Sequence, residues 1–408
     1  MMGLSLFFRK IAAGAVMAVA VGTATAHPIT VSHGVKHSPW VLTHVEMVMR
    51  HGIRSPLPWQ VPHGVGVIGG WPVWAVPAGN LTQHGAEALQ EVGQYDRLWL
   101  GQVRVLPKVG CPDAGRVQII ANSAQRTIAS AEAFREGLVP GCALSIEHFA
   151  PGQMDVRFAP LDAAPQRFDM QKIVPQLPDP QVLYARDKAA LQLLGRVVRC
   201  SSGVCPFLDA PSTVAPDRTG HGLVLSGPVS DGASLAEALI LAYVDGRETG
   251  WGQLTPEALG QLSVLHADML ATVNRPKVLA KLLSQDMRAQ LVRDMVESSA
   301  QSPALRVYVG HDDTIAPLLT ALGVHVQAPG QAEDEIPVGS ALILALYHNQ
   351  RTNMDAYRVF FQAQSLEGLR NLGEQGLPQL QPLTVPECRD TLGFCASAVL
   401  INRLKKGE

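Results

Sequence analysis

The sequence predicts an α/β protein: a sheet domain flanked by helices, with a mainly helical inserted domain. Three stretches share one pattern, in which a short, apolar, β-rich run is followed by a polar turn, and two of them lead directly into an amphipathic helical pattern. Strands that alternate with helices in this way are typical of α/β sheets. The composition agrees, because 47% hydrophobic and 17% charged residues provide a large core and exclude a disordered, fibrous or coiled-coil chain.

The three strand patterns are Val41–Met49, Val117–Ala121 and Leu305–Val309. Helical patterns follow the second and third at Ile128–Leu138 and Ile315–Leu322, and Gly323 supplies a stop signal after the latter. Another helix is predicted within Ala86–Gln102, where apolar side chains recur at helical spacing. These elements build the predicted sheet and part of its helical cover.

The pattern becomes mainly helical between about Pro165 and Val273, with the loop Cys200–Gly232 between helical segments. Within this region, Ser234–Glu237 has the sequence of a capping box, which predicts the start of a helix that runs to about Asp245. We interpret the region as an insertion into the sheet domain.

Strand patterns return after Pro303 and continue through Ala341–Leu346 and Tyr357–Phe361. The α/β catalytic domain is therefore predicted to be discontinuous. The predicted boundaries are residues 27–164 and 274–408 for the α/β domain and residues 165–273 for the helical insertion domain.

The first residues have the composition of a secretory signal peptide. The basic residues Arg9 and Lys10 precede the apolar stretch Ile11–Val21, and the small residues of Ala24–Ala26 follow it. The alternative is a membrane anchor, but the apolar stretch is too short to span a bilayer. We predict that residues 1–26 are a cleaved signal peptide, and that the mature protein is periplasmic or secreted and does not associate with a membrane.

Export changes the interpretation of the six cysteines, because an oxidising compartment favours disulfides over thiolate metal sites. Proximity along the chain favours three pairs: Cys111 with Cys142, Cys200 with Cys205, and Cys388 with Cys395. No Cys-x-x-Cys occurs, and the spacings are not those of a zinc ribbon. The cysteines are therefore expected to form structural disulfides, and no metal site is predicted.

Charge and glycine patterns exclude two further classes of ligand. The 33 Lys and Arg residues nearly cancel the 35 Asp and Glu residues, with no long run of either sign, so nucleic acid is an unexpected partner. Gly64–Gly69 matches the dinucleotide pattern G-x-G-x-x-G, but Pro62 precedes it, Trp71 and Pro72 follow it, and no helix opens there. We interpret it as a flexible loop and predict no cofactor.

The first predicted strand runs into Arg50–Pro56, at the strand end where open α/β sheets bind ligands. Arg50 and Arg54 beside His51 form an anion clamp around a potential nucleophile. The same positive field keeps His51 neutral, the form that can attack phosphorus. Gly52 is expected to let the backbone approach a ligand closely. The alternative is an ordinary basic turn with a solvated histidine.

The other two strands also end in charged or polar residues. Arg126 follows the second strand in or near a first helical turn, where backbone amides already favour an anion, although an exposed structural arginine is the alternative. His311, after the third strand, can bind a phosphoryl oxygen, and a carboxylic acid beside it can protonate a departing alkoxide. We assign the acid role to Asp312 and a helix-capping role to Asp313.

Together the three strand ends form an oxyanion pocket with a nucleophile and an acid. The chemistry that suits such a pocket is phosphoryl transfer through a phosphohistidine, in which cations stabilise the equatorial oxygens without needing a metal.

The motif Arg-His-Gly-x-Arg-x-Pro at residues 50–56, followed far downstream by His311–Asp312, resembles the histidine acid phosphatases. These form a branch of the histidine phosphatase superfamily that includes bacterial phytases and periplasmic glucose-1-phosphatases. Trp71–Trp74 and Ala121–Thr127 are also similar to segments of the bacterial members. The resemblance covers most of the mature chain and is weakest across the insertion.

The resemblance implies a histidine-phosphatase-like sheet domain and a histidine acid phosphatase, which the chemistry of the pocket predicts to be metal-independent. Because an acid that must hold its proton near so many cations has a lowered pKa, we predict an acidic pH optimum. The resemblance also implies that His51 is the phosphorylated nucleophile and Asp312 the general acid, and it assigns phosphate binding to these residues: Arg50, Arg54, Arg126 and His311. The expected partner is a small phosphomonoester, and a monomer is favoured. The alternatives are a mutase and a non-enzymatic phosphate or sugar-phosphate binding protein. The acid Asp312 argues against the binding protein, because a protein that only binds gains nothing from a proton donor.

The substrate is expected to be a sugar phosphate or a broad range of monoesters at least as much as phytate. No Lys or Arg occurs between Ser55 and Asp96, and Leu57 and Pro58 stand where phytase-type members of the family have Thr and a basic residue. Three tryptophans could stack on a sugar ring or belong to the core: Trp59, Trp71 and Trp74.

Overall fold

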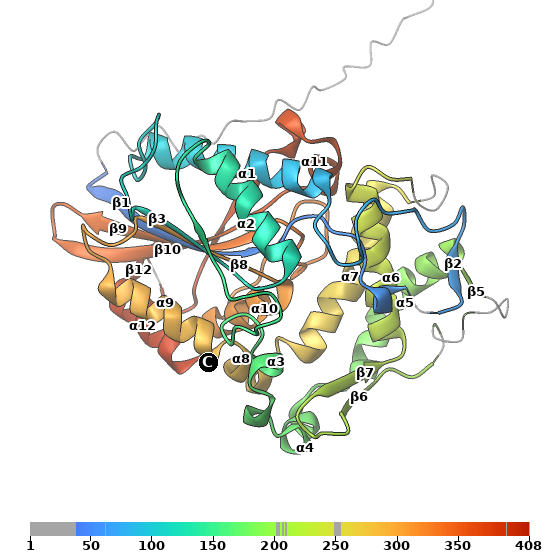
Figure 1. Cartoon of the computed structure of the whole chain (residues 1–408). Coiled ribbons are helices and arrows are strands. Elements are labelled where there is room, and N and C mark those ends of the chain that lie inside the picture. Colours follow the sequence, from blue (N-terminus) through green and yellow to red (C-terminus); the bar gives the residue numbers. More distant parts are fainter. Residues whose placement is uncertain are drawn as a thin grey trace, which may run out of the picture. The chain divides into compact units, whose positions relative to one another are not determined.

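Figure 1 shows the protein as a computed structural model. The structure describes residues 38–61, 63–200, 205, 208, 210–248, 254–388 and 390–407. The predicted signal peptide, residues 1–26, lies outside the described residues. The chain from Pro39 onward belongs to one compact unit.

A mixed sheet of eight strands occupies the centre of this unit (Figure 1). The strands are β1 (Trp40–Arg50), β3 (Val117–Ala121), β4 (Ile146–Glu147), β8 (Leu305–Gly310), β9 (Ala341–Asn349), β10 (Met354–Ala363), β11 (Gln379–Leu383) and β12 (Cys395–Ala396). Their order is β11-β10-β9-β1-β8-β3-β4, and β12 pairs with β10. All five predicted strands are confirmed.

The middle of the sheet brings three distant segments to one edge. β1 and β3 both run parallel to β8, with Arg50 opposite Gly310 and Ala121 opposite Val309. Parallel strands end at the same edge, so the residues that follow β1, β3 and β8 emerge side by side. This topology, which the sequence pattern alone does not specify, assembles the site.

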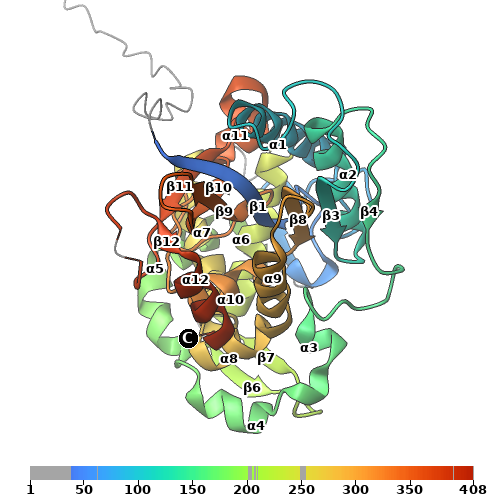
Figure 2. The ribbon, with the colours of Figure 1, turned by 90° about the vertical axis from the view of Figure 1, so that its left-hand side faces the viewer.

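Helices cover both faces of the sheet (Figure 2). They are α1 (Gln83–Gln102) and α2 (Gln125–Leu138) on one face, and α9 (Gln285–Glu297), α10 (Asp312–Leu322) and α12 (Ser397–Lys406) on the other. Met47 and Met49 of β1 pack in the cluster with α1 and α2, whereas Val48 between them packs in the cluster with α9, α10 and α12. Because both faces are buried, β8 is apolar except for Arg306 rather than alternating, and β1 ends in the apolar run Met47–Met49 before Arg50.

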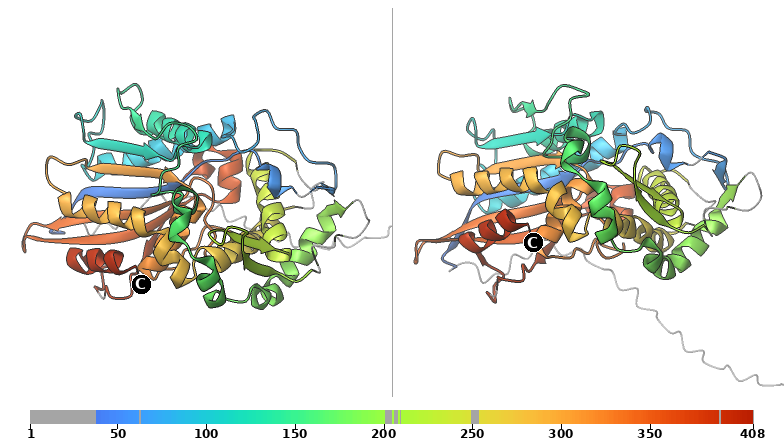
Figure 3. Two further views of the ribbon diagram at one scale, coloured as in Figure 1. Left: turned by 60° about the horizontal axis from the view of Figure 1, so that its bottom comes forward. Right: turned by 90° about the horizontal axis from the view of Figure 1, so that it is seen from below.

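A second group of helices packs together beside the sheet (lime to yellow in Figure 3). It consists of α5 (Pro180–Val197), α6 (Pro228–Val244) and α7 (Pro256–Val273), with the hairpin β6 (Thr213–Pro216) and β7 (Leu223–Ser226). These elements lie in the predicted insertion, although its boundaries stay a prediction.

The remaining elements are β2 (Val65–Val67), β5 (Val198–Cys200), α3 (Pro160–Ala163), α4 (Met170–Ile173), α8 (Lys277–Leu283), α11 (Leu366–Asn371) and the 3-10 helices η2 (Pro58–Gln60), η3 (Pro165–Arg167), η4 (Val174–Gln176) and η7 (Gly373–Gly376).

The predicted capping box at Ser234–Glu237 is wrong. Helix α6 begins at Pro228, after Gly227 with φ 83°, so this segment lies inside the helix. Proline at the first helical position and a positive φ that suits glycine define the true start. The Glu237 side chain is therefore available for contacts outside its own helix.

The glycine-rich segment Gly64–Gly69 is only partly a loop. Val65–Val67 forms strand β2, which pairs antiparallel with β5. No helix follows it, which agrees with the rejection of a dinucleotide site.

The structure contains the three disulfides that proximity along the chain predicts. They are Cys111–Cys142, Cys200–Cys205 and Cys388–Cys395. In the part of the chain that the structure describes, no helix has both the length and the apolar character that crossing a bilayer requires.

Candidate active site

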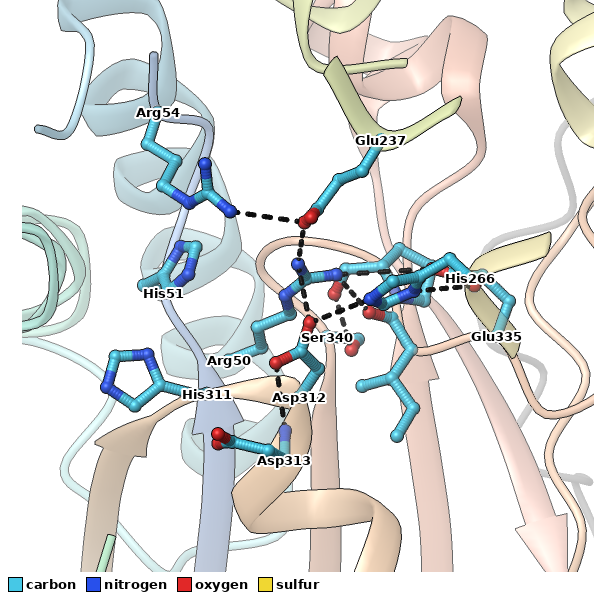
Figure 4. A network of polar contacts seen from close by, with 12 residues as sticks. Arg50, His51, Arg54, Glu237, His266, His311, Asp312, Asp313, Glu335 and Ser340 are labelled. Atoms are coloured by element: carbon cyan, nitrogen blue, oxygen red, sulfur yellow. Dashed lines mark hydrogen bonds and ion pairs between the residues drawn. The ribbon is translucent and has the colours of Figure 1, made fainter. Parts of the chain in front are cut away.

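The ends of β1 and β8 bring five of the predicted site residues together: Arg50, His51, Arg54, His311 and Asp312 (Figure 4). The backbone N–H of His51 donates to the Gly310 carbonyl at 2.9 Å, which fixes the end of β1 against the end of β8. The His51 and His311 rings lie edge to face, with their centroids 5.5 Å apart. As predicted, Arg126 occupies the first turn of α2, which begins at Gln125.

His51 is buried and has one ring nitrogen already engaged. Its Nδ1 lies 2.8 Å from the Gly52 carbonyl oxygen, so Nδ1 carries the proton in this tautomer and Nε2 keeps a free lone pair. Burial, together with the positive field of Arg54 and Arg126, holds the pKa of His51 well below its usual range. The ring is therefore neutral and able to act as a nucleophile.

Gly52 serves a different purpose from the predicted one. A Cβ built on Gly52 would lie 2.7 Å from a Leu89 side-chain carbon and 3.1 Å from the Gly85 carbonyl oxygen, both in α1. The close approach that requires glycine is thus to helix α1 and not to a ligand.

His311 presents a hydrogen-bond donor. Its Nε2 lies 2.7 Å from the Asn122 amide nitrogen, which donates to it, so the remaining ring proton is on Nδ1. Burial and Arg126 lower the pKa of His311 to about 3. A neutral His311 can therefore donate one hydrogen bond to an anionic oxygen.

The arginines differ in how far they are already paired. Arg54 donates through Nη1 to Gln60 Oε1 at 2.8 Å and lies 3.3 Å from Glu237 through Nη2. Among the described residues, Nε of Arg126 is buried and has no hydrogen-bond partner. Nε of Arg50 and Nε of Arg54 share this condition, but those two arginines form ion pairs with Glu237, and Arg126 forms none with the described residues.

Arg50 is surrounded by carboxylates. Its Nη2 forms an ion pair with Glu237 and lies 2.8 Å from Asp312 Oδ2, and its Nη1 donates to the Ile336 carbonyl oxygen at 2.6 Å. Glu335 lies 4.0 Å from the same guanidinium. The predicted phosphate ligand Arg50 thus also fixes the acidic side of the site.

The acid pair lies at the start of α10. His311 is the N-cap, so the capping role predicted for Asp313 is wrong. Asp312 Oδ1 accepts from the Asp313 backbone N–H at 2.8 Å. Burial alone would raise the pKa of Asp312, but Arg50 and His266 outweigh burial and hold the pKa well below its usual range. Desolvation and the neighbouring Asp312 carboxylate raise the pKa of Asp313 to about 7.

The sequence analysis missed three residues that contact the site. Glu237, His266 and Glu335 are buried, and each contacts Arg50, Asp312 or both. Glu237 is the lone charged residue of the apolar run Gly232–Val244, a signal that could have identified it. His266 interrupts the apolar face of α7 in the same way.

One group of side chains has the donor atoms of a metal site. Among the described residues, ligand atoms of Glu237, His266 and Asp312 lie within 4.8 Å of one another. The Arg50 guanidinium, however, already contacts both carboxylates and supplies the positive charge between them. The arrangement therefore does not fit a cation.

The sequence and this geometry match a known class of protein. The chain belongs to the histidine phosphatase superfamily (branch 2), whose family model matches residues 41–173 and 248–362. The unmatched stretch between these ranges lies inside the predicted insertion. This membership confirms the family that the sequence analysis identified and the predicted enzyme class, a phosphoric monoester hydrolase.

Individual relatives are similar over almost the whole chain. The glucose-1-phosphatase of Salmonella typhimurium is 28% identical over an alignment of 405 residues that covers 93% of this chain and 95% of the relative. Phytase AppA of Escherichia coli is 28% identical over 398 residues, covering 88% and 90% of the two chains. The solved structure of the Klebsiella sp. ASR1 phytase aligns with a TM-score of 0.81 at 26% identity and covers 90% of this chain and 96% of that one.

Proposed function

We propose that the protein is an exported acid phosphomonoesterase that forms a phosphohistidine on His51. The observation that carries the proposal is the tautomer of His51: Nδ1 is bound to a backbone carbonyl, and Nε2 is free beside three arginines. Those arginines and His311 can bind the oxygens of a transferring phosphoryl group, whose charge they stabilise.

In the first step, Nε2 of His51 attacks phosphorus and the ester P–O bond breaks. The departing alkoxide takes a proton from the Asp312 carboxyl group and leaves as an alcohol. Arg54 and Arg126 neutralise the phosphoryl oxygens, and His311 donates to one of them through Nδ1. The positive end of α2, where Arg126 lies, supports the same charge.

In the second step, a water molecule attacks the phosphohistidine. The Asp312 carboxylate accepts a proton from that water, the N–P bond breaks, and inorganic phosphate is released. His51 returns to its neutral form and Asp312 to its protonated form. Because Arg50 and His266 lower the pKa of Asp312, the protonated acid is most populated in acid, which supports an acidic pH optimum.

The surroundings of the site support a monophosphate of a neutral alcohol, such as a sugar, as the substrate. Glu237 places a carboxylate against Arg50 and Arg54, which weakens the positive field that a polyphosphate would need. Trp59 is 69% exposed and can stack on a sugar ring. Trp71 and Trp74 instead pack against the cluster of the inserted helices.

The three disulfides support residence in an oxidising compartment, and we propose the periplasm or the exterior of the cell.

The test is phosphate release by the mature protein with EDTA present, from glucose 1-phosphate, phytate and an aryl phosphate, across about pH 3 to 8. We expect activity that survives chelation, is highest in acid, favours glucose 1-phosphate over phytate and is lost in His51→Ala. His44→Ala is the matched control, because His44 is a buried histidine on the same strand that contacts Ser299. Binding of these esters without phosphate release by the wild type would contradict the proposal and leave a binding protein.

A further inference from the structure

His266 lies between two carboxylates from different parts of the chain (Figure 4). It belongs to α7 and is 2% exposed. Its Nε2 is 3.1 Å from Asp312 Oδ2, and its Nδ1 is 3.0 Å from both carboxylate oxygens of Glu335. The ring thus links the proposed general acid to a second, buried acid.

The charged groups that face His266 come from four segments of the chain. Asp312 from α10, Glu335 from the segment before β9 and Glu237 from α6 are acidic, and Arg50 from β1 is basic. Burial alone would lower the pKa of His266, but Glu335 and Asp312 raise the pKa well above its usual range. A protonated ring donates a hydrogen bond from each nitrogen, which suits acceptors on both sides.

This arrangement answers a difficulty in the mechanism. Arg50 and His266 stabilise Asp312 as a carboxylate, yet the departing alkoxide requires a proton from it. Three donors contact the Asp312 carboxylate: Arg50 and the Asp313 backbone N–H at 2.8 Å, and Nε2 of His266 at 3.1 Å. Of these, only the imidazolium can give up a proton near neutral pH, because a guanidinium and a backbone amide keep theirs.

We propose that His266, oriented by Glu335, is a positioning residue that holds Asp312 in place and supplies the proton that Asp312 delivers to the leaving group. As the ester P–O bond breaks, the Nε2 proton of His266 moves to the Asp312 carboxylate, and the Asp312 carboxyl group delivers a proton to the alkoxide and is again a carboxylate. His266 becomes neutral, and its Nδ1–H continues to donate a hydrogen bond to Glu335. In the second step the proton from the attacking water returns through Asp312 to Nε2. The inference rests on the proposed function.

The test compares two esters with different needs for a proton. The leaving group of 4-nitrophenyl phosphate departs readily as an anion, whereas that of glycerol 2-phosphate requires protonation. General acid catalysis contributes about 10²–10⁴-fold. We expect His266→Gln to lower kcat on glycerol 2-phosphate by at least about 30-fold and on 4-nitrophenyl phosphate by less than about threefold. The high-pH limb of the glycerol 2-phosphate profile shifts toward acid by about one unit or more.

A second variant and a control complete the test. Glu335→Gln keeps the ring and its approximate packing but removes the charge that stabilises the imidazolium, so it shifts the same limb in the same direction by a smaller amount. His44→Gln removes another buried histidine and leaves the ratio of the two kcat values unchanged. Should His266→Gln fail to fold by circular dichroism, the pH profile of Glu335→Gln decides.

Equal losses on both esters, or unshifted pH limbs in both variants, would overturn the inference and leave His266 a packing residue. A wild-type protein that hydrolyses neither ester would instead overturn the proposed function.

Discussion

A histidine must be neutral to attack phosphorus, and two features of the site keep His51 in that state. Burial removes solvent that would stabilise an imidazolium, and the arginines disfavour a positive charge on the His51 ring. The same surroundings make His311 neutral, and both rings carry their proton on Nδ1. The rings differ in which nitrogen is already engaged: Nδ1 of His51 contacts the Gly52 carbonyl oxygen, whereas Nε2 of His311 accepts from Asn122. One environment therefore gives the proposed nucleophile a free Nε2 and the proposed phosphate ligand a free Nδ1–H.

Asp312 and Asp313 differ in their charge environments, and this difference gives the first prediction. Asp312→Asn should lower kcat on an alkyl phosphate by about 10²–10⁴-fold, because it removes the group that we propose protonates the leaving oxygen. Asp313→Asn should lower kcat by less than about tenfold, because only Asp312 contacts Arg50 and His266. Steady-state kinetics on glycerol 2-phosphate measures both, and a larger loss in Asp313→Asn would reverse the assignment.

At the scale of elements, the sequence predicted strands far better than the start of α6. Val117–Ala121 matches β3 residue for residue, because an apolar run bounded by polar residues has few alternative structures. The start of α6 was misplaced because Gly227 and Pro228, which define it, lie within a segment interpreted as a loop. A local pattern cannot show which of two possible starts the tertiary structure selects.

The same limit explains which site residues were found. His51, Arg126 and His311 follow predicted strands, so the rule that α/β sheets bind ligands at strand ends locates them. Glu237, His266 and Glu335 reach the site from helices or a loop far away along the chain, and only the packed structure shows that contact.

Helices α1 and α2 pack with glycines at their contact, which gives the second prediction. A Cβ on Gly93 would lie 2.3 Å from the Phe134 carbonyl oxygen and 2.7 Å from the Leu138 backbone nitrogen. Because backbone atoms cannot rotate away, Gly93→Ala should lower the free energy of unfolding by about 2 kcal/mol or more. Urea denaturation measures the change.

Gly195→Ala is the matched control within α5. Its Cβ would approach only the flexible end of Leu208, at 3.0 Å, and alanine favours a helix over glycine by about 1 kcal/mol. Its unfolding free energy should stay within about 1 kcal/mol of the wild type. Equal losses in the two variants would show that the contact between α1 and α2 adjusts freely.

At the scale of the whole molecule, disulfides restrict the unfolded chain to different extents. Cys111–Cys142 closes a sequence separation of 31 residues, and Cys200–Cys205 closes one of 5. Loop-closure entropy predicts that replacing both cysteines of the long loop by serine lowers the unfolding free energy by about 3–4 kcal/mol. The same replacement in the short loop should lower it by about 2 kcal/mol. Urea unfolding of the two double variants checks the order, and a larger loss in the short loop would contradict it.

The stability of the whole molecule should also favour acid, as an acid phosphatase requires, and Glu46 provides the test. This β1 carboxyl is 1% exposed, and Oε2 has no hydrogen-bond partner among the described residues. Burial raises the pKa of Glu46 to about 8, although Arg306, 3.8 Å away, opposes the rise. The folded protein therefore binds this proton more tightly than the unfolded chain. The contribution of Glu46 protonation to the free energy of unfolding is therefore complete below the ordinary glutamate pKa, and it is lost as the pH rises toward 8.

Glu46→Gln removes this dependence, because a neutral amide carries no titrating proton. The unfolding free energy of the variant minus that of the wild type should increase by at least about 1 kcal/mol from about pH 5 to about pH 8. Urea unfolding at both pH values measures this change. The control is Glu132→Gln, which alters an exposed carboxyl on α2 and should leave the difference between the two pH values unchanged. If Glu46→Gln and the wild type lost stability in parallel toward pH 8, the decline would come from other groups, and the buried carboxyl of β1 would not adapt the fold to acid.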